Sequence, residues 1–193
     1  KAHPEIGSSR IRRVYERSGL SLSKKLRRHI KDNPANPIEI PFASNEEWAM
    51  DFMSDALFDG RKIRTLNVID HFNRKCLGIK IGFNMPARLV IQSLEYIIEL
   101  HGKPKKIRTD NGPEFRSKLF HKWLFSNGIE WSRIQKGKPQ QNAIIERFNK
   151  TYREDVLDAN IFMNITQANE ITGTWINDYN NEVDKISSSQ NND

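Results

Sequence analysis

Two acidic residues, Asp110 and Glu146, lie next to the ends of expected elements, where catalytic residues are commonly found. Asp110 follows the expected short strand at residues 106–109, and the Asn-Gly-Pro after it stops a strand and forms a tight turn. Glu146 follows a polar loop and falls in the first turn of an expected helix, for which Asn142 is a candidate cap. The two acids have 35 residues between them, and a site built on this spacing needs a third acid. The sequence predicts one carboxylate at the end of a strand and one at the start of a helix.

The best third acid lies upstream. Asp51 stands in the middle of the half-apolar segment Glu47–Ser54, which is typical of a strand. Three carboxylates from separate elements can hold two divalent cations about 4 Å apart, an arrangement that activates a nucleophile and stabilises a leaving oxygen in phosphodiester chemistry. Because Mg²⁺ prefers hard oxygen ligands, Mg²⁺ or Mn²⁺ is the expected metal, with two ions in the site.

Each acid alone also has an ordinary explanation. Asp110 could satisfy the backbone amides of its own turn, Glu146 could complement a helix dipole, and Asp51 could be an edge-strand charge. Among the other acids, only Glu114, four residues beyond Asp110, is a candidate to position the three acids without being one of them.

Taken in order, three motifs resemble a known signature. Asp51, then Thr-Asp110-Asn-Gly-Pro-Glu-Phe, then Gln-Asn-Ala-Ile-Ile-Glu146-Arg-Phe-Asn-Lys, is similar to the Asp-Asp-35-Glu pattern of the retroviral-integrase superfamily. More narrowly the chain resembles the OrfB-type transposases of bacterial insertion sequences with two reading frames, from about residue 41 to 179. The resemblance implies that Asp51, Asp110 and Glu146 are the catalytic and metal-binding residues.

The same resemblance implies an activity and its partners. It implies metal-dependent cleavage of a DNA strand, followed by joining of the exposed 3′ hydroxyl to target DNA. The expected partners are double-stranded DNA, further copies of the chain, and a helix-turn-helix protein from the second reading frame.

Turn signals and apolar spacing predict the elements that must position these acids. Strands are expected at residues 47–54, 62–69, 76–82, 106–109 and 129–134, and helices at 86–101, 116–127, around Glu146, and at 161–177. In the second helix Leu119, Phe120, Trp123 and Leu124 are expected to face inward. Three antiparallel strands followed by alternating helix and strand predict an α/β fold with a mixed five-stranded sheet and flanking helices. It resembles the ribonuclease-H-like fold.

The positive charge of the chain is concentrated near its N-terminus. The net charge is +7, and nine Lys and Arg stand against one acid between residues 10 and 31. We expect a basic DNA-binding arm at 1–32 that includes Arg27 and Arg28, a Pro-rich linker at 33–44, the catalytic core at 45–180, and a disordered tail at 181–193.

Helical spacing places more polar side chains beside Glu146. Asn149, Lys150 and Arg153 are expected on its face of the helix, where they could contact DNA phosphates, and Lys138 and Gln141 in the preceding loop could extend this surface. The alternative is a merely solvated charged face.

Composition limits the remaining possibilities. Cys76 is the only cysteine, so no disulfide forms within the chain, and no apolar run is long enough to span a membrane. We expect a cytoplasmic, nucleoid-associated protein.

Two rival functions stay open: a nuclease of the same fold that cuts without joining, and a decayed transposase that only binds DNA. The second rests on the segment after Tyr179, which departs from the Tyr-Asn-x-x-Arg-Pro-His of the resembling transposases.

Overall fold

The described structure is the core of the chain. A computed structural model describes residues 41–110, 112–134 and 139–190, all within the unit Ile38–Asp193. The expected arm at 1–32, most of the linker, Arg27, Arg28 and Lys138 lie outside the described residues. Among the described helices, none has the length and apolarity to cross a membrane.

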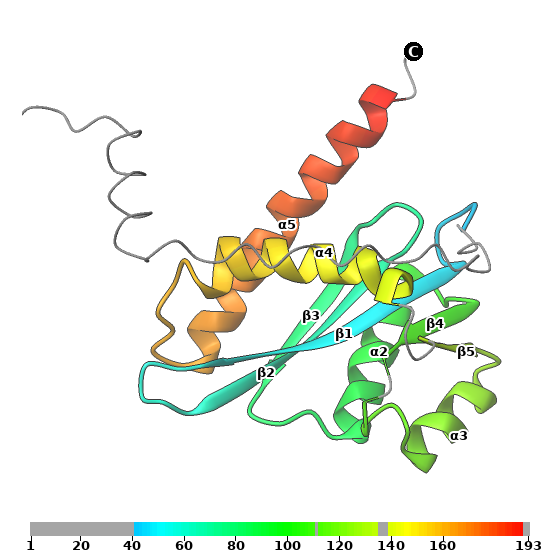
Figure 1. The fold of residues 1–193 in the computed structure, drawn as a ribbon, viewed down its shortest axis with the longest axis horizontal. Coiled ribbons are helices and arrows are strands. Elements are labelled where there is room, and N and C mark those ends of the chain that lie inside the picture. Colours follow the sequence, from blue (N-terminus) through cyan, green and yellow to red (C-terminus); the bar gives the residue numbers. More distant parts are fainter. Residues whose placement is uncertain (1–40, 111, 135–138, 191–193) are drawn as a thin grey trace, which may run out of the picture. The chain divides into compact units, whose positions relative to one another are not determined.

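A five-stranded mixed sheet forms the centre of the fold (Figure 1). Its strands are β1 (Glu47–Ala56), β2 (Lys62–Asp70), β3 (Cys76–Gly82), β4 (Lys106–Thr109) and β5 (Glu130–Arg133). The spatial order is β3-β2-β1-β4-β5, with the first three strands antiparallel and β4 and β5 parallel to their neighbours. Gly60 has φ 83°, which suits the tight β1–β2 turn because glycine has no Cβ to clash there. The central strand is therefore β1, which carries Asp51.

Helices cover both faces of the sheet (Figure 1). They are α2 (Ala87–His101), α3 (Lys118–Ser126), a 3₁₀ turn (Pro139–Asn142), α4 (Ala143–Tyr152), a π turn (Arg153–Leu157) and α5 (Ile165–Gln190). One core joins α2 and α3 to one face, and a second core joins α4, the π turn and α5 to the other.

Alternation along β1 assigns its side chains to these two cores. Trp48 and Met50 are buried in the core beneath α2 and α3, whereas Ala49 belongs to the core beneath α4 and α5. Because successive strand residues point to opposite faces, Asp51 shares the face of Ala49. Asp51 therefore lies on the side of the sheet that α4 covers.

The expected fold class is confirmed, and most expected boundaries agree with the structure. The observed β3 and β4 have the expected limits, and the other strands and α2 differ from expectation by two residues or fewer at each end. Three details of the expected helices are wrong. The helix expected from residue 161 begins at Ile165. Leu119 is 50% exposed rather than inward, because it lies in the first turn of the short α3 and faces the gap toward α2. Asn142 makes no side-chain capping bond, since its φ of −107° and ψ of 0° are not the extended geometry of a cap.

The expected disordered tail is also wrong for residues 181–190, which continue α5. Contacts with the edge strand β3 account for the longer helix. Asn180 accepts a hydrogen bond from the Cys76 amide (2.8 Å) and donates one to the Cys76 carbonyl (2.9 Å). Lys75 Nζ lies 2.7 Å from Asp184 Oδ1. These contacts hold the later turns of the helix against the sheet, which local composition does not reveal.

Candidate active site

Asp51 occupies a half-buried position on the central strand. Its Oδ1 accepts a hydrogen bond from the Phe52 amide (2.8 Å), and its Oδ2 accepts one from Asn149 Nδ2 on α4 (2.8 Å). Across the hairpin, Asp51 stands opposite Asn67 of β2. Both carboxylate oxygens are therefore oriented by donors from the surrounding protein.

The register of β1 and β4 brings Asp110 level with Asp51. The paired residues run from Glu47 with Lys106 to Ala49 with Arg108, a constant difference of 59 in residue number. Two positions further, the same difference links Asp51 to Asp110, which directly follows the last residue of β4. The two acids thus stand on neighbouring strands at one end of the sheet.

A close turn fixes the Asp110 carboxylate. The Gly112 amide donates to Asp110 Oδ1 (2.9 Å). A Cβ on Gly112 would lie 3.1 Å from this same oxygen, so the Asp110 carboxylate would have to shift by a few tenths of an ångström to admit a larger residue. The turn thus brings backbone and carboxylate into close approach, which glycine allows because it has no Cβ.

Glu146 enters from α4, which packs over the same face. Ile145, Phe148 and Tyr152 are buried, and they fix which side of α4 faces the sheet. Glu146 lies in the first turn of the helix with its side chain exposed. A carboxylate is stabilised at this position because the helix N-terminus carries partial positive charge.

The three acids share one electrostatic environment. Burial raises the pKa of Asp51, the Asp110 and Glu146 carboxylates raise it further, and the net result is a pKa of about 6 despite the bonds from Phe52 and Asn149. A raised pKa means that the Asp51 carboxylate is not dominated by a neighbouring cation. The site therefore concentrates negative charge that a divalent cation would neutralise.

Hard oxygen donors with surplus negative charge match the ligand preference of Mg²⁺. In the part of the chain that the structure describes, no three acidic, histidine or cysteine side chains already converge as a metal cluster. The donor atoms of Asp51 instead contact protein groups, as expected for carboxylates that repel one another. The residue types and the negative charge around Asp51 fit the ligand chemistry of a divalent-metal site.

Asn149 has a different environment from that expected for a DNA contact. It is half-buried, donates to Asp51, and accepts a hydrogen bond from Asn67 Nδ2 (2.7 Å). The chain of hydrogen bonds from Asn67 through Asn149 to Asp51 therefore links β2, α4 and β1. Asn67 was not expected at the site, although a polar residue in a strand between Leu66 and Val68 was an available signal.

Arg153 and Lys150 differ in how they are engaged. Arg153 donates to the Ser54 carbonyl (2.8 Å) and pairs with Asp55 (3.3 Å) and Asp158 (3.2 Å). Its guanidinium thus ties the end of α4 to β1. Lys150 is exposed, and its Nζ lies 3.7 Å from a Glu154 carboxylate oxygen.

Glu114 supports the turn that follows Asp110. It forms an ion pair with Arg64 of β2, and the Arg64 guanidinium lies 4.5 Å from the centre of the Phe52 ring. That ring stacks on Phe115 with centroids 4.9 Å apart. The turn is thereby attached to β1 and β2, next to the two aspartates.

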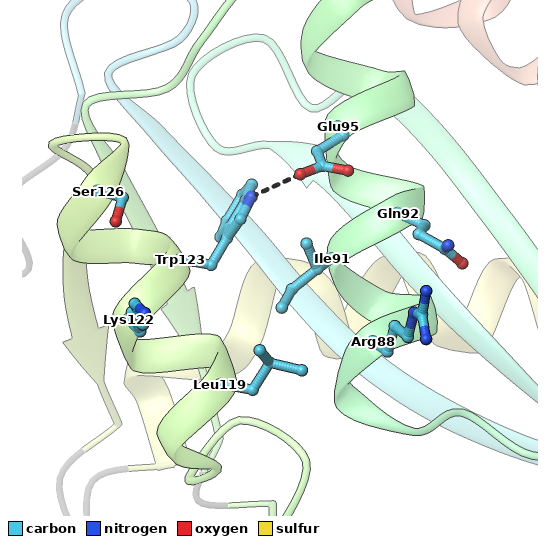
Figure 2. Close-up of a pocket in the computed structure, with 8 residues that line it drawn as sticks. All are labelled: Arg88, Ile91, Gln92, Glu95, Leu119, Lys122, Trp123 and Ser126. Atoms are coloured by element: carbon cyan, nitrogen blue, oxygen red, sulfur yellow. Dashed lines mark hydrogen bonds between the residues drawn. The ribbon is translucent and has the colours of Figure 1, made fainter.

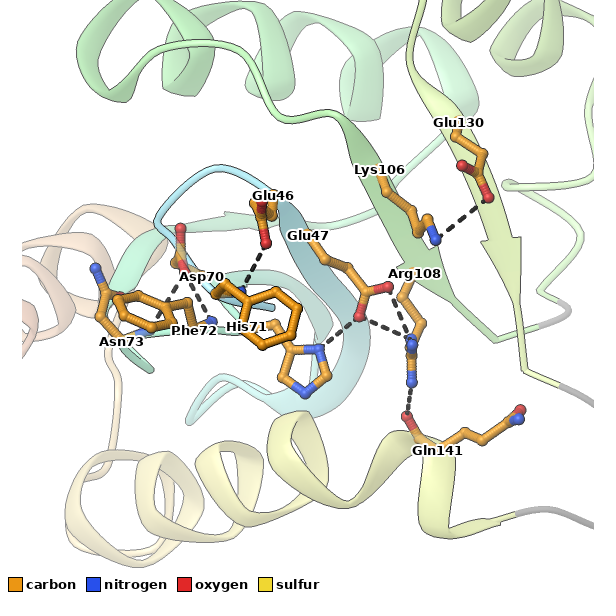
Figure 3. A network of polar contacts seen from close by, with 11 residues as sticks. Glu46, Glu47, Asp70, His71, Phe72, Asn73, Lys106, Arg108, Glu130 and Gln141 are labelled. Carbon is orange, nitrogen blue, oxygen red and sulfur yellow. Dashed lines mark hydrogen bonds and ion pairs between the residues drawn. The ribbon is translucent and has the colours of Figure 1, made fainter. Parts of the chain in front are cut away.

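Gln141 marks the entry to α4, in the 3₁₀ turn. Its backbone carbonyl accepts a hydrogen bond from Arg108 Nη1 (3.0 Å), and Arg108 contacts the buried Glu47 (Figure 3). Neither Arg108 nor Glu47 was expected to be buried, since a charged residue in a strand gives no sign of its burial in the sequence.

A pocket on the other face of the sheet contains none of these residues. It lies between α2 and α3, where Trp123 Nε1 donates to Glu95 Oε1 (3.0 Å) (Figure 2). The candidate catalytic residues lie on the side that α4 covers, so this pocket is not the candidate active site.

The sequence matches the integrase core domain family over residues 42–139, and a second family described as integrase core domain over residues 127–183. The chain belongs to the integrase core domain family. Within this core domain, the matched regions together include Asp51, Asp110 and Glu146.

Relatives of this integrase core domain come from insertion elements. The insertion element IS407 uncharacterized 31.7 kDa protein of Burkholderia multivorans is 35% identical over 173 residues, covering 90% of this chain and 62% of that protein. The transposase for insertion sequence element IS904 of Lactococcus lactis is 29% identical over 169 residues, covering 86% of this chain and 64% of that protein. The chain thus spans a little under two thirds of the length of these relatives.

A solved structure shares the fold of this integrase core domain. The HTLV-2 integrase catalytic core domain, in complex with magnesium and in a dimeric form, matches with a TM-score of 0.53 and 23% identity. The match covers 67% of this chain and 83% of that one. The expected ribonuclease-H-like fold is thereby confirmed.

Proposed function

We propose that this chain is the catalytic part of an OrfB-type insertion-sequence transposase. It would cleave a DNA strand and join the exposed 3′ hydroxyl to a target phosphodiester. The observation that carries the proposal is the placement of Asp51, Asp110 and Glu146, from three separate elements, at one end of an integrase-core sheet. Relatives named as transposases support it.

In this proposal Asp51, Asp110 and Glu146 hold two Mg²⁺ or Mn²⁺ ions. The metal supplies Lewis acidity that activates the attacking oxygen and neutralises the leaving one. The magnesium in the HTLV-2 structure and the surplus negative charge around Asp51 support this assignment. Asn149 orients the Asp51 carboxylate, and Glu114 steadies the turn that carries Asp110.

DNA binding is assigned to Lys150 in the described core and to basic residues outside the described part of the chain. Lys150 is exposed near Glu146 on α4 and is the described residue best placed to contact a phosphate. Lys138, Arg27 and Arg28 are kept as proposed DNA contacts, and the basic arm at 1–32 as the main source of nonspecific affinity. Asn149 and Arg153 are reassigned to protein positioning, because both are engaged by protein groups.

The proposed partners are double-stranded DNA, further copies of this chain and a helix-turn-helix protein from a second reading frame. A dimeric form of the HTLV-2 core domain supports self-association. The proposed location is the cytoplasm, in association with the nucleoid.

Purified protein, incubated with Mg²⁺ or Mn²⁺ and the DNA that flanks its own gene, tests the proposal. Asp51→Asn, Asp110→Asn and Glu146→Gln are each expected to abolish cleavage while the fold persists, because each removes a ligand charge. Asp55→Asn is the matched control, since it makes the same change on the same strand outside the triad. A folded variant that cleaves normally would remove its residue from the triad.

The same assay separates the rival functions. A pre-cut DNA end that is joined to a target supports the transposase. Cleavage without joining would identify a nuclease, and DNA binding without either reaction would identify a decayed remnant.

A further inference from the structure

A buried ionic network lies behind the three carboxylates. Glu47 and His71 are 5% and 6% exposed, and Arg108 is 8% exposed. Arg108 Nη2 donates to Glu47 Oε2 (3.0 Å), while its Nε lies 3.0 Å from Oε1 as an ion-pair contact whose angle is not that of a hydrogen bond. His71 Nδ1 bonds to Glu47 Oε1 from the other side (Figure 3). The Glu47 carboxylate is thus held between two nitrogen partners.

The network extends to the helix that carries Glu146. Arg108 Nη1 donates to the Gln141 carbonyl (3.0 Å), in the 3₁₀ turn that runs directly into α4. One guanidinium therefore links β1, β4 and the entry of α4 (Figure 3).

Each linked residue shortly precedes a triad member along the chain. Glu47 stands four residues before Asp51 on β1, and Arg108 stands two residues before Asp110. Gln141 stands five residues before Glu146. The network therefore joins all three of the segments that carry the acids, each at a position two to five residues before its acid.

Stability alone is a weak reason to bury such a network. Removing charged groups from water is costly, and buried ion pairs are often replaceable by apolar residues without loss of stability. The charge of Glu47 is nevertheless retained, because burial acts to raise its pKa but His71 and Arg108 outweigh that effect and lower it. A network with a small net effect on stability can still specify geometry.

We propose that Arg108 is a positioning residue that fixes the entry of α4, so that Glu146 lies beside Asp51 and Asp110 when metal binds. The effect on Glu146 and metal binding rests on the proposed function, whereas the anchoring of α4 by Arg108 does not. The buried Ile145 and Phe148 hold the body of α4 on the sheet, whereas the 3₁₀ turn that leads into the helix is bonded to the sheet through Gln141. The Arg108–Gln141 bond provides that attachment.

Two variants separate positioning from stability. Arg108→Lys keeps the positive charge beside Glu47 but cannot reach Glu47 and the Gln141 carbonyl with one planar group. The double variant Glu47→Gln with Arg108→Met removes both buried charges, so neither partner is left as an unpaired charge, and it also lacks the donor to Gln141. Lys106→Gln is the matched control. Lys106 also lies on β4, but its ion pair with Glu130 (3.4 Å) links β4 to β5 and not to α4.

The first measurement is amide hydrogen exchange, without metal or DNA, on a peptide that covers residues 139–148. Both Arg108 variants are expected to exchange at least tenfold faster there, while peptides from β1 and β2 match the wild type. The Lys106→Gln control is expected to exchange like the wild type. Unchanged exchange in both Arg108 variants would overturn the anchoring.

The second measurement is the Mg²⁺ concentration for half-maximal cleavage. Groups that hydrogen-bond metal ligands directly typically contribute about 10–100-fold to affinity or activity, and Arg108 acts one step further out, through the entry of α4. We therefore expect about a tenfold increase in the Arg108 variants, the low end of that range, at an unchanged melting temperature. Normal Mg²⁺ dependence with faster exchange would overturn the positioning role. A wild type that neither cleaves nor responds to Mg²⁺ would instead refute the proposed function, and the exchange result would still decide whether Arg108 anchors α4.

Discussion

Asp51→Asn is expected to stabilise the metal-free protein at neutral and alkaline pH. The Asp51 pKa rises from 3.8 to about 6 on folding, chiefly through burial and also through the negative charges of Asp110 and Glu146. A shift of about two units at about 1.36 kcal/mol each makes the ionised side chain cost about 3 kcal/mol. One of the two hydrogen bonds to the carboxylate is removed in the amide, which offsets about 1 kcal/mol. The net gain is about 2 kcal/mol.

The pH dependence follows from the direction of the shift. Since the folded state binds the Asp51 proton more tightly than the unfolded state, Asp51 does not oppose folding at low pH, and its penalty grows as the pH rises from about 3.8 through about 6. The advantage of Asp51→Asn should therefore be full at about pH 8 and vanish near pH 4. For a domain of this size, about 2 kcal/mol corresponds to about 4–8 °C in melting temperature.

Thermal and urea unfolding in EDTA, at pH 8 and pH 4, measures this difference. Asp55→Asn on the same strand is the control, and it should give no gain because it removes a partner of Arg153. Adding Mg²⁺ should raise the melting temperature of the wild type more than that of Asp51→Asn. If Asp51→Asn were no more stable than the wild type at pH 8 in EDTA, the three carboxylates would not share the repulsive environment inferred for them.

Four further outcomes are expected. Asn149→Ala removes the side-chain donor to Asp51 and should raise the Mg²⁺ concentration for half-maximal cleavage by about 10–100-fold, measured by metal titration. Arg153→Gln should lower the free energy of unfolding by about 1 kcal/mol in urea titrations with little effect on DNA affinity, because its guanidinium is engaged by protein oxygens. Lys150→Gln should do the reverse, changing stability by less than about 0.5 kcal/mol while weakening DNA binding. Deleting residues 1–32 should flatten the dependence of log K on log salt by about 0.9 for each phosphate that the arm neutralises, and an unchanged slope would contradict a DNA-binding arm.

The strands of the sheet, and the element on or next to which each acid lies, could be predicted from sequence because both depend on local signals. Apolar alternation and the turn at Gly60 define the hairpins, and Asn-Gly-Pro ends β4 directly at Asp110. Helical spacing likewise predicted that Phe120 and Leu124 would face inward, and both are buried.

Contacts between distant elements could not be predicted in this way. A helical wheel places Asn149 beside Glu146, but whether that face meets solvent or a strand depends on how α4 crosses the sheet. In the structure Asn149 forms hydrogen bonds with Asp51 and Asn67. Arg153 donates a hydrogen bond to the Ser54 carbonyl, near the end of β1. The Arg108 network could not be predicted for the same reason, since its partners are 61 and 33 residues away.

The register between β1 and β4 also determines where the chain can tolerate changes in length. Trp48 and Ile107 pair in that register, and both are fully buried. One residue inserted within β4 would turn Asp110 to the opposite face and destroy the pairing of the acids, because side chains alternate along a strand. An insertion at the exposed turn of Asp59 and Gly60 would leave the register intact, since surface loops absorb extra residues at little entropic cost. Length variation among such chains should therefore accumulate in the hairpin turns and avoid the four residues that lead into Asp110.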